Sequence, residues 1–348
     1  MRVILYISTF FILNVSVVHA HIINLNDFPI YIKKGFQKSW TKTTPENIED
    51  WIKIEPKPTG RLLRLSELKH PSIPRRSFFS LKSHKKETYT LIIPFTLQEA
   101  LSDSNIGLFL KEIGEQWEIY CNGKQIHHHQ SQFNRLILLS LTSSIKTGAN
   151  ILTFKIIGDP TLRFTGFNKS SPYIVGTLSS LLPYKDESIF LILTFLYLFV
   201  GIYHFFLFII RTSEKYNLYY ALFNVALFIS FIMKTAHIQI LIPELKQSNR
   251  IELVGVYLLI PFISSFLDLI LNKKISTITK INYAIHIICI AASMFTPMPF
   301  VFDILTVWQI VAPLALVYIV FIVIKAFIKD IKILHVTSPS LIHSIGRA

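Results

Sequence analysis

The sequence predicts a chain of two parts, an all-β sandwich followed by an all-α bundle of transmembrane helices. Three observations support this fold class. Apolar residues make up 51% of the 348 residues and charged residues only 16%, which is unusual for a soluble globular protein. A polar stretch over residues 21–186 contains short β-rich segments separated by turns. From residue 187 onwards, apolar segments of about 20 residues follow one another, the length that a helix needs to cross a bilayer.

The first 20 residues form a predicted secretory signal peptide. Arg2 precedes an apolar segment over about Val3–Leu13, and Val18 and Ala20 place small residues at the two key positions of a cleavage site. The apolar segment is shorter than a membrane span, which favours a cleaved signal over an uncleaved anchor. We therefore expect residues 21–186 to lie outside the cytoplasm.

Residues 21–186 form the predicted sandwich. Turn residues such as Asn122-Gly123 and Gly158-Asp159-Pro160 separate β-rich segments, and no long amphipathic helical pattern occurs among them. Several short strands at this spacing are typical of a β-sandwich. The predicted strands are Tyr89–Phe95, Ile106–Leu110, Gln116–Cys121, Arg135–Leu141, Asn150–Ile157 and Tyr173–Leu178.

A hairpin is the most specific local pattern in this region. Side chains from Trp117 onwards alternate across a strand, and Asn122-Gly123 then supplies the residues of positive φ that a type I′ turn requires. The segment resembles the W-x-V-Y-x-N-G hairpin of jelly-roll, galactose-binding-like domains, over about Leu91–Ile157. Such sandwiches often bind sugars, so the resemblance makes Trp117, Tyr120 and Asn122 candidate ligand-binding residues. The alternative is that Trp117 fills the core of the sandwich, as large aromatic side chains usually do.

Three consecutive histidines, His127, His128 and His129, follow the hairpin turn and raise the question of a metal site. Side chains of consecutive strand residues point to opposite faces, so these three cannot all converge on one ion, and we expect no metal there. The sequence also lacks the nucleophile, zinc-protease, phosphate-loop and dinucleotide motifs that mark enzymes. We therefore expect neither catalysis nor a cofactor.

Five apolar segments form the predicted bundle. They are expected to be helical because lipid offers backbone groups no hydrogen-bond partner. The fourth segment is the shortest, and Pro297 and Pro299 close it. The predicted spans are about 188–210, 218–238, 251–271, 281–297 and 304–328, and residues 329–348 form a short tail.

The formal net charge of +14 would suit either nucleic-acid binding or a membrane protein with basic loops. If the sandwich lies outside, the inner loops and the tail hold nine basic residues, and the outer loops hold only Lys246 and Arg250. This bias obeys the positive-inside rule and agrees with the signal peptide. No helix-turn-helix, zinc finger or aromatic RNA platform occurs, so we expect a lipid bilayer and not nucleic acid as the partner.

Charged residues inside the spans are candidates for function because ionisable groups in lipid are costly. Depth along the helices places Lys234 level with Glu252, near the outer ends of their spans. It places His204 level with Asp268, nearer the inner side. We therefore expect two intramembrane polar pairs. The alternative for Lys234 and Asp268 is that they reach the membrane surface, since each lies within two turns of a span end.

Two segments carry a resemblance to a known family. Residues 195–208 hold a glycine and many aromatic residues, and Arg211–Phe223 form a short charged turn followed by a "Y-L-Y-Y-A-L-F"-like start of the next span. Together with the order of signal peptide, sandwich and bundle, they resemble the bacterial seven-transmembrane receptors with diverse intracellular signalling modules. The resemblance extends over nearly the whole chain as a pattern of apolar positions.

The resemblance implies a receptor in the bacterial inner membrane, with a periplasmic sandwich that binds a ligand such as a carbohydrate. The bundle would relay the signal to a cytoplasmic output such as a histidine kinase or a diguanylate cyclase. This sequence departs from the family in showing five spans and no output domain after them, so we expect a truncated receptor that works through a separate partner or as a homo-oligomer. The alternatives are a membrane-anchored binding or scaffold protein without signalling, and a small transporter.

Overall fold

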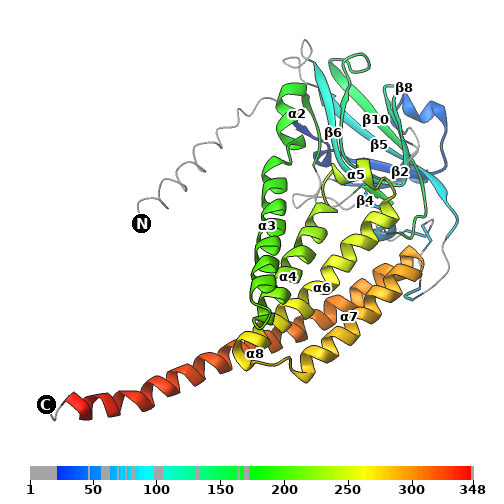
Figure 1. Cartoon of the computed structure of the whole chain (residues 1–348). Coiled ribbons are helices and arrows are strands. Elements are labelled where there is room, and N and C mark those ends of the chain that lie inside the picture. The colour runs from blue at the N-terminus through cyan, green and yellow to red at the C-terminus, as the bar shows by residue number, and fades with distance from the viewer. Residues whose placement is uncertain are drawn as a thin grey trace. The chain divides into compact units, whose positions relative to one another are not determined.

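The computed structural model describes residues 22–45, 48–55, 63–68, 70–71, 73–74, 77–79, 84–97, 105–129, 133–162, 165–167 and 172–345. The predicted signal peptide lies outside these described residues. The chain divides into two compact units (Figure 1). The first unit comprises Met1–Arg75 and His84–Asp186, and the second comprises Arg76–Ser83 and Glu187–Ala348. The second unit therefore includes a short segment that interrupts the first unit in sequence.

The first unit is a sandwich of two antiparallel sheets, which confirms the predicted all-β fold of this region. The first sheet, named here the β5 sheet, has the order β3 (Ile52–Ile54), β2 (Ile30–Lys34), β5 (Glu87–Leu97), β10 (Gly148–Gly158), β7 (Gln116–Cys121) and β8 (Lys124–His129). The other, the β6 sheet, has the order β1 (Ile23–Asn24), β12 (Tyr173–Thr177), β6 (Ile106–Gly114), β11 (Gly166–Phe167) and β4 (Leu63–Arg64), with β9 (Phe133–Ser140) also paired to β6. Short 3-10 helices lie at η1 (Leu25–Asp27), η2 (Lys38–Thr41), η3 (Ile48–Asp50) and η4 (Leu65–Glu67).

Alternating side chains of the strands form the core of the sandwich. On β7, Trp117, Ile119 and Cys121 are each 1% exposed or less and belong to this core. The rings of Phe154 and Phe167, from opposite sheets, meet edge to face with their centroids 4.7 Å apart. The period-two pattern of the sequence is therefore used to bury one face of each sheet against the other.

The predicted hairpin joins β7 to β8. Asn122 has φ +49° and Gly123 has φ +87°, the positive values that a type I′ turn requires. The Asn122 side chain fixes the turn, because its Oδ1 accepts from the backbone N–H of Ile151 at 2.9 Å and its Nδ2 donates to the backbone oxygen of Ser144 at 2.9 Å. The turn is thus bonded to β10 and to the loop before β10.

The second unit is mainly helical, as Figure 1 shows. Its helices are α3 (Ser188–Ile210), α4 (Lys215–Ile232), α5 (Ile238–Leu241), α6 (Leu245–Asn272), α7 (Thr277–Phe295) and α8 (Met298–Ile345), and α2 (Leu178–Lys185) precedes them at the end of the first unit. This arrangement confirms the predicted all-α region after the sandwich. The α8 helix extends through most of the segment that was predicted to be a tail.

Four helical segments of the described chain are long and apolar enough to cross a membrane, where the sequence predicted five spans. They are Leu178–Ile210, Lys246–Asn272, Thr277–Phe295 and Met298–Ile328. The α4 helix stands at the second predicted span, but it has only 18 residues and includes the buried amides Asn217 and Asn224.

Glycines bring α4 close to its two neighbours. A Cβ atom at Gly255 of α6 would lie 2.5 Å from Ser230 Oγ and 2.9 Å from the backbone oxygen of Ala226, both on α4. On the other side, a Cβ at Gly201 of α3 would lie 3.3 Å from the backbone oxygen of Ala221. Small residues therefore permit close helix contacts, as is usual in membrane bundles.

Candidate functional site

The structure places the predicted ligand residues of the hairpin mostly inside the fold. Trp117 is 1% exposed and Tyr120 is 7% exposed. Asn122 is bonded within the fold, since its Nδ2 also donates to Asn150 Oδ1 at 2.8 Å. Of the three, Tyr120 lies on the outer side of its strand, where its ring stacks on Phe36 with centroids 5.4 Å apart.

A row of polar residues crosses the outer face of the β5 sheet beside Tyr120. The strand register pairs Lys33 with Thr90, Thr90 with Lys155, Lys155 with Glu118 and Glu118 with His128. Directly paired residues share one face of a sheet, so these side chains form one line across five strands. Lys155 Nζ lies 2.8 Å from Glu118 Oε1, which fixes the middle of the line.

Aromatic side chains cover one end of this row. Trp40 of η2 and Trp51, next to β3, meet edge to face at 5.1 Å, and Lys33 Nζ lies 5.3 Å and 5.7 Å from their ring centroids. Lys155 Nζ lies 5.0 Å from the ring centroid of Phe36. We call Phe36, Trp40, Trp51, Lys33 and Lys155 the aromatic face. Its half-buried rings and its cations offer both stacking surfaces and hydrogen-bond donors to a polar ligand.

The ionisation of the row is set by its own contacts. Burial alone would raise the pKa of Glu118, but hydrogen bonds from Lys155 and Tyr120 and the charge of Lys155 outweigh it and lower that pKa. Burial, with the hydrogen bond to Glu118, raises the pKa of Tyr120 to about 12. Near neutral pH, Glu118 is therefore an ionised carboxylate and Tyr120 a neutral phenol. In the described part of the chain, no group of three or more His, Cys, Asp or Glu side chains is arranged to hold a metal.

In the helical unit, the structure brings one of the two predicted pairs together. Lys234 Nζ lies 3.6 Å from Glu252 Oε1, with the side chains 45% and 20% exposed. His204 does not meet Asp268. Its Nδ1 lies 3.0 Å from Asn217 Oδ1 instead.

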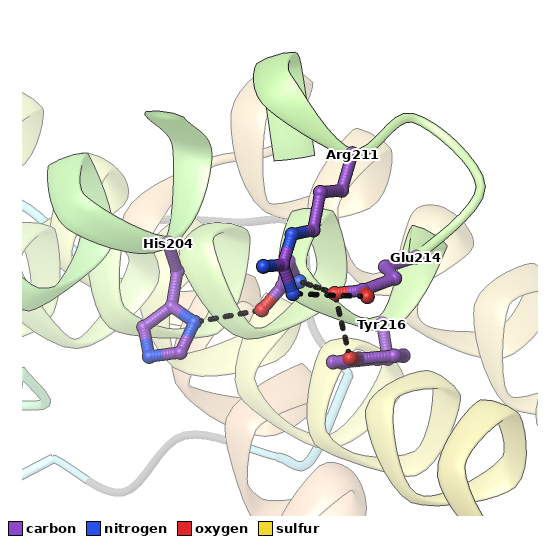
Figure 2. Close-up of polar contacts among 5 residues, drawn as sticks. His204, Arg211, Glu214 and Tyr216 are labelled. Carbon is purple, nitrogen blue, oxygen red and sulfur yellow. Dashed lines mark hydrogen bonds and ion pairs between the residues drawn. The ribbon is translucent and has the colours of Figure 1, made fainter. Parts of the chain in front are cut away.

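The contact of His204 belongs to a cluster at the turn between α3 and α4 (Figure 2). Glu214 Oε2 accepts from Tyr216 OH at 2.8 Å and from Asn217 Nδ2 at 3.1 Å, and Arg211 lies 3.4 Å from Glu214 Oε1. The hydrogen bond from Tyr216 is the main reason that the pKa of Glu214 is lowered. The charged turn is therefore bonded to side chains in the first turn of α4 and connects to His204 through Asn217.

Asp268 is fully buried and accepts hydrogen bonds from several segments. Its Oδ2 accepts from Ser276 N at 2.8 Å and from Thr279 Oγ1 at 2.7 Å, and its Oδ1 accepts from Tyr318 OH at 2.9 Å and Asn272 Nδ2 at 3.2 Å. Because Tyr318 is on α8, this one carboxylate joins α6, the start of α7 and α8. The sequence marked Asp268 as a candidate, but no local pattern indicated these partners.

The segment of the second unit that comes from between β4 and β5 also contacts α8. The backbone N–H of Phe79 donates to Asp303 Oδ2 at 2.8 Å, and the rings of Phe79 and Phe300 lie 5.3 Å apart. Phe79 has φ +59°, which is unfavourable for a bulky residue, and Asp303 is 5% exposed. Sequence reasoning missed this contact. The available signal was an acidic residue next to an apolar segment.

The family comparison concerns this helical region. Residues 186–333 match the family model described as 7TM diverse intracellular signalling. The match confirms the resemblance seen in the sequence for the helical region, which is less than half of the chain. Its helices are long and apolar enough to cross a membrane, and the match makes this region similar to that of receptor-like or sensor-like membrane proteins.

Two glycoside hydrolases of known structure are similar to part of the chain at low sequence identity. No curated protein matches the chain. An uncultured Clostridium beta-glucuronidase is similar in structure with TM-score 0.33 and 16% identity, covering 45% of this chain and 29% of that one. A glycosyl hydrolase family 2 member from Bacteroides cellulosilyticus DSM 14838 has TM-score 0.32 and 14% identity, covering 43% of this chain and 20% of that one. The chain spans less than a third of the length of either protein.

Proposed function

We propose that this protein is a membrane sensor in which the sandwich binds a ligand and the helices relay the signal. The contact of Phe79 with Asp303 carries the proposal. The chain on either side of Arg76–Ser83 belongs to the sandwich, whereas this segment belongs to the helical unit. A change in the sandwich would therefore act on α8 through a short covalent connection. A bundle with two arrangements needs only such a bias to shift its population.

The aromatic face supports a carbohydrate as the ligand. Trp40 and Trp51 are half-buried, so part of each ring remains open for stacking on a sugar ring. Lys33 and Asp50, which lie 3.2 Å apart at its edge, would bind hydroxyl groups. Tyr120 belongs to this proposal as the residue that holds Phe36.

The proposal places the sandwich in the periplasm and the far end of α8 in the cytoplasm of a bacterium, as the basic residues of the loops favour. The chain itself would catalyse no reaction. It would act on a separate cytoplasmic signalling partner or on a second copy of itself. A binding protein without signalling is the alternative, and the experiment below separates the two.

The test uses the full chain in lipid nanodiscs. A glycan array would identify a bound sugar, and Trp51→Ala should reduce that binding at least tenfold. Tyr184→Ala, which changes an exposed aromatic residue outside the aromatic face, should not reduce it.

A spin label would then be placed at Phe78→Cys, which is 56% exposed, in a chain carrying Cys289→Ala. Cys121 is fully buried and can stay.

Addition of the bound glycan should change the mobility of the label, and a glycan that does not bind should leave it unchanged. Asp303→Asn should make the label mobile with or without glycan, because it weakens the hydrogen bond that holds Phe79. Glycan binding without any change in the mobility of the label would indicate a binding protein without signalling and would contradict the relay. Equal binding by Trp51→Ala would contradict the aromatic face.

A further inference from the structure

Buried polar atoms without hydrogen-bond partners occur on α6, α7 and α8 among the described residues. Asn282 and His286 lie one turn apart on α7 and are 7% and 0% exposed, and Trp308 of α8 faces His286 with ring centroids 6.4 Å apart. Among the described residues, Asn282 Nδ2, His286 Nε2 and Trp308 Nε1 are buried and have no hydrogen-bond partner. Ser264 Oγ on α6 is also buried and has no hydrogen-bond partner among the described residues.

The chemistry of these atoms is defined by one contact. His286 Nδ1 lies 2.7 Å from the backbone oxygen of Asn282. A carbonyl oxygen only accepts, so Nδ1 carries the proton and Nε2 is an acceptor in the neutral ring. Trp308 and Asn282 offer N–H donors close by. The cluster therefore contains two N–H donor groups and one nitrogen acceptor, all three without partners among the described residues.

Two prolines leave backbone carbonyl oxygens without their helical donors on residues close to Trp308. Pro261 lies inside α6 and has no N–H, so the carbonyl oxygen of Tyr257 loses its usual helical donor. The ring of Tyr257 lies 5.6 Å from that of Trp308. Pro313 in α8 has the same effect on the carbonyl of Gln309, next to Trp308. In lipid, such interruptions are tolerated where another group can bond the freed carbonyls.

We infer that His286, Asn282 and Trp308 bind a hydroxyl group inside the helical unit. One hydroxyl oxygen accepts from Trp308 and Asn282, and its hydrogen is donated to His286 Nε2. Water supplies this chemistry, and so does the head of a long-chain alcohol that enters from the lipid. The apolar residues Ile260, Ala312 and Ala315, which pack beside Trp308, would contact the chain of such an alcohol. The site is independent of the ligand proposed for the sandwich.

The experiment places 5-fluorotryptophan in the full chain in nanodiscs and follows its fluorine NMR signals. Trp308→Phe identifies the Trp308 signal among the four tryptophans. The sample is titrated with 1-octanol, and with octane as the matched molecule without a hydroxyl. A second measurement compares the Trp308 signal in H2O and D2O.

We expect 1-octanol to shift the Trp308 signal saturably and octane to leave it unshifted. His286→Phe should weaken the octanol effect about tenfold, the factor that corresponds to one hydrogen bond. Asn282→Ala gives the same test if His286→Phe does not fold. Ile288→Ala, on the outward side of α7 and 66% exposed, is the control and should bind as the unchanged chain does.

The outcomes separate the two sources of the hydroxyl group. A solvent isotope shift at Trp308 without an octanol effect, lost in His286→Phe, supports a bound water. An octanol effect equal to that of octane, together with no isotope shift, would overturn the inference. The sandwich plays no part in these measurements. Failure of this inference would therefore not contradict the proposed sensor function, which the glycan experiment tests separately.

Discussion

In the sandwich, the largest buried side chains are apolar: Trp117, Phe109, Phe154 and Phe167 are each 1% exposed or less. In the helical unit, the fully buried side chains include Ser264, Ser265, Asp268, Thr279 and His286. Its large apolar side chains are mostly turned outwards, among them Ile192, Ile288 and Phe321, which are 68%, 66% and 59% exposed. Both units bury some residues of each kind, such as Asn150 in the sandwich and Val301 in the helical unit, but polar side chains make up a larger share of the buried residues in the helical unit.

The difference follows from the solvent around each unit. In water, apolar side chains are driven inside, and the sandwich is stabilised by their burial. Lipid is itself apolar, so helices in a membrane gain little from burying leucine or isoleucine against each other. Small residues and hydrogen bonds between helices must hold them together, as Gly255 and Asp268 do here.

The comparison predicts that the largest loss of stability comes from Trp117→Ala. The substitution removes the largest fully buried side chain, and we expect the free energy of unfolding of the sandwich to fall by about 4 kcal/mol. Urea unfolding of the chain, followed by near-UV circular dichroism, measures this effect. Trp40→Ala, on the half-buried aromatic face, should cost less than half as much. Unchanged stability of Trp117→Ala with loss of glycan binding would make Trp117 a ligand residue.

Asp268→Ala should have the next largest effect and act on the helical unit. It leaves the donors of Tyr318, Thr279 and Ser276 without their acceptor, and we expect a loss of about 3 kcal/mol. Thermal unfolding in nanodiscs, with the sandwich signal as an internal reference, measures it. Tyr318→Phe removes only one donor and should cost about 1 kcal/mol. Equal effects of the two variants would argue against a shared acceptor.

A smaller effect is expected from pH at the outer face of the β5 sheet. The pKa of Glu118 is lowered from its ordinary value of 4.5, so its contacts stabilise the fold above that pH and are lost as the pH falls through the folded pKa. Between about pH 5 and pH 3, the unchanged chain should lose more stability than Glu118→Gln, by an amount on the order of 1 kcal/mol or less. Urea unfolding at each pH measures it. Glu55→Gln, in the exposed Lys53–Glu55 pair, should behave as the unchanged chain does.

The smallest effect is expected at a side chain that faces lipid. Ile288→Ala should change the stability of the helical unit by less than about 0.5 kcal/mol, because its surroundings are apolar in either state. Ile119→Ala, at a fully buried position of the sandwich, should cost about 3 kcal/mol. Parallel unfolding measurements on the two variants test the comparison directly. A similar cost at both positions would mean that Ile288 packs against protein.

The sequence predicted the sandwich best where alternation and turn chemistry coincide. The strand predicted at Gln116–Cys121 has those bounds in the structure, and Asn122-Gly123 forms the expected turn. The strands β1 to β4 were missed because they are short and lie among 3-10 helices, so no periodic pattern is long enough to detect. The aromatic face depends on these segments. Its residues are distant in sequence and meet only through strand register.

In the helical unit, composition predicted the helices, and depth along the chain predicted one contact. Depth alone places Lys234 near Glu252, because adjacent antiparallel helices keep residues of equal depth together. The same argument failed to find the partner of His204, since it ignores which side of the helix a residue occupies. Partners such as Tyr318 for Asp268, 50 positions apart, require the folded arrangement.

The length of α8 has a mechanical consequence. The helix runs without interruption over 48 residues, far beyond the roughly 20 that cross a bilayer. From Tyr318, where Asp268 holds it, to Ile345 it extends about 40 Å. Pro339 lies near its end and removes one backbone hydrogen bond, so a rotation of α8 at Tyr318 would be carried along an otherwise continuous helix as far as that residue. The contact between Asp268 and Tyr318 would therefore fix the rotational position of the part of α8 that follows it.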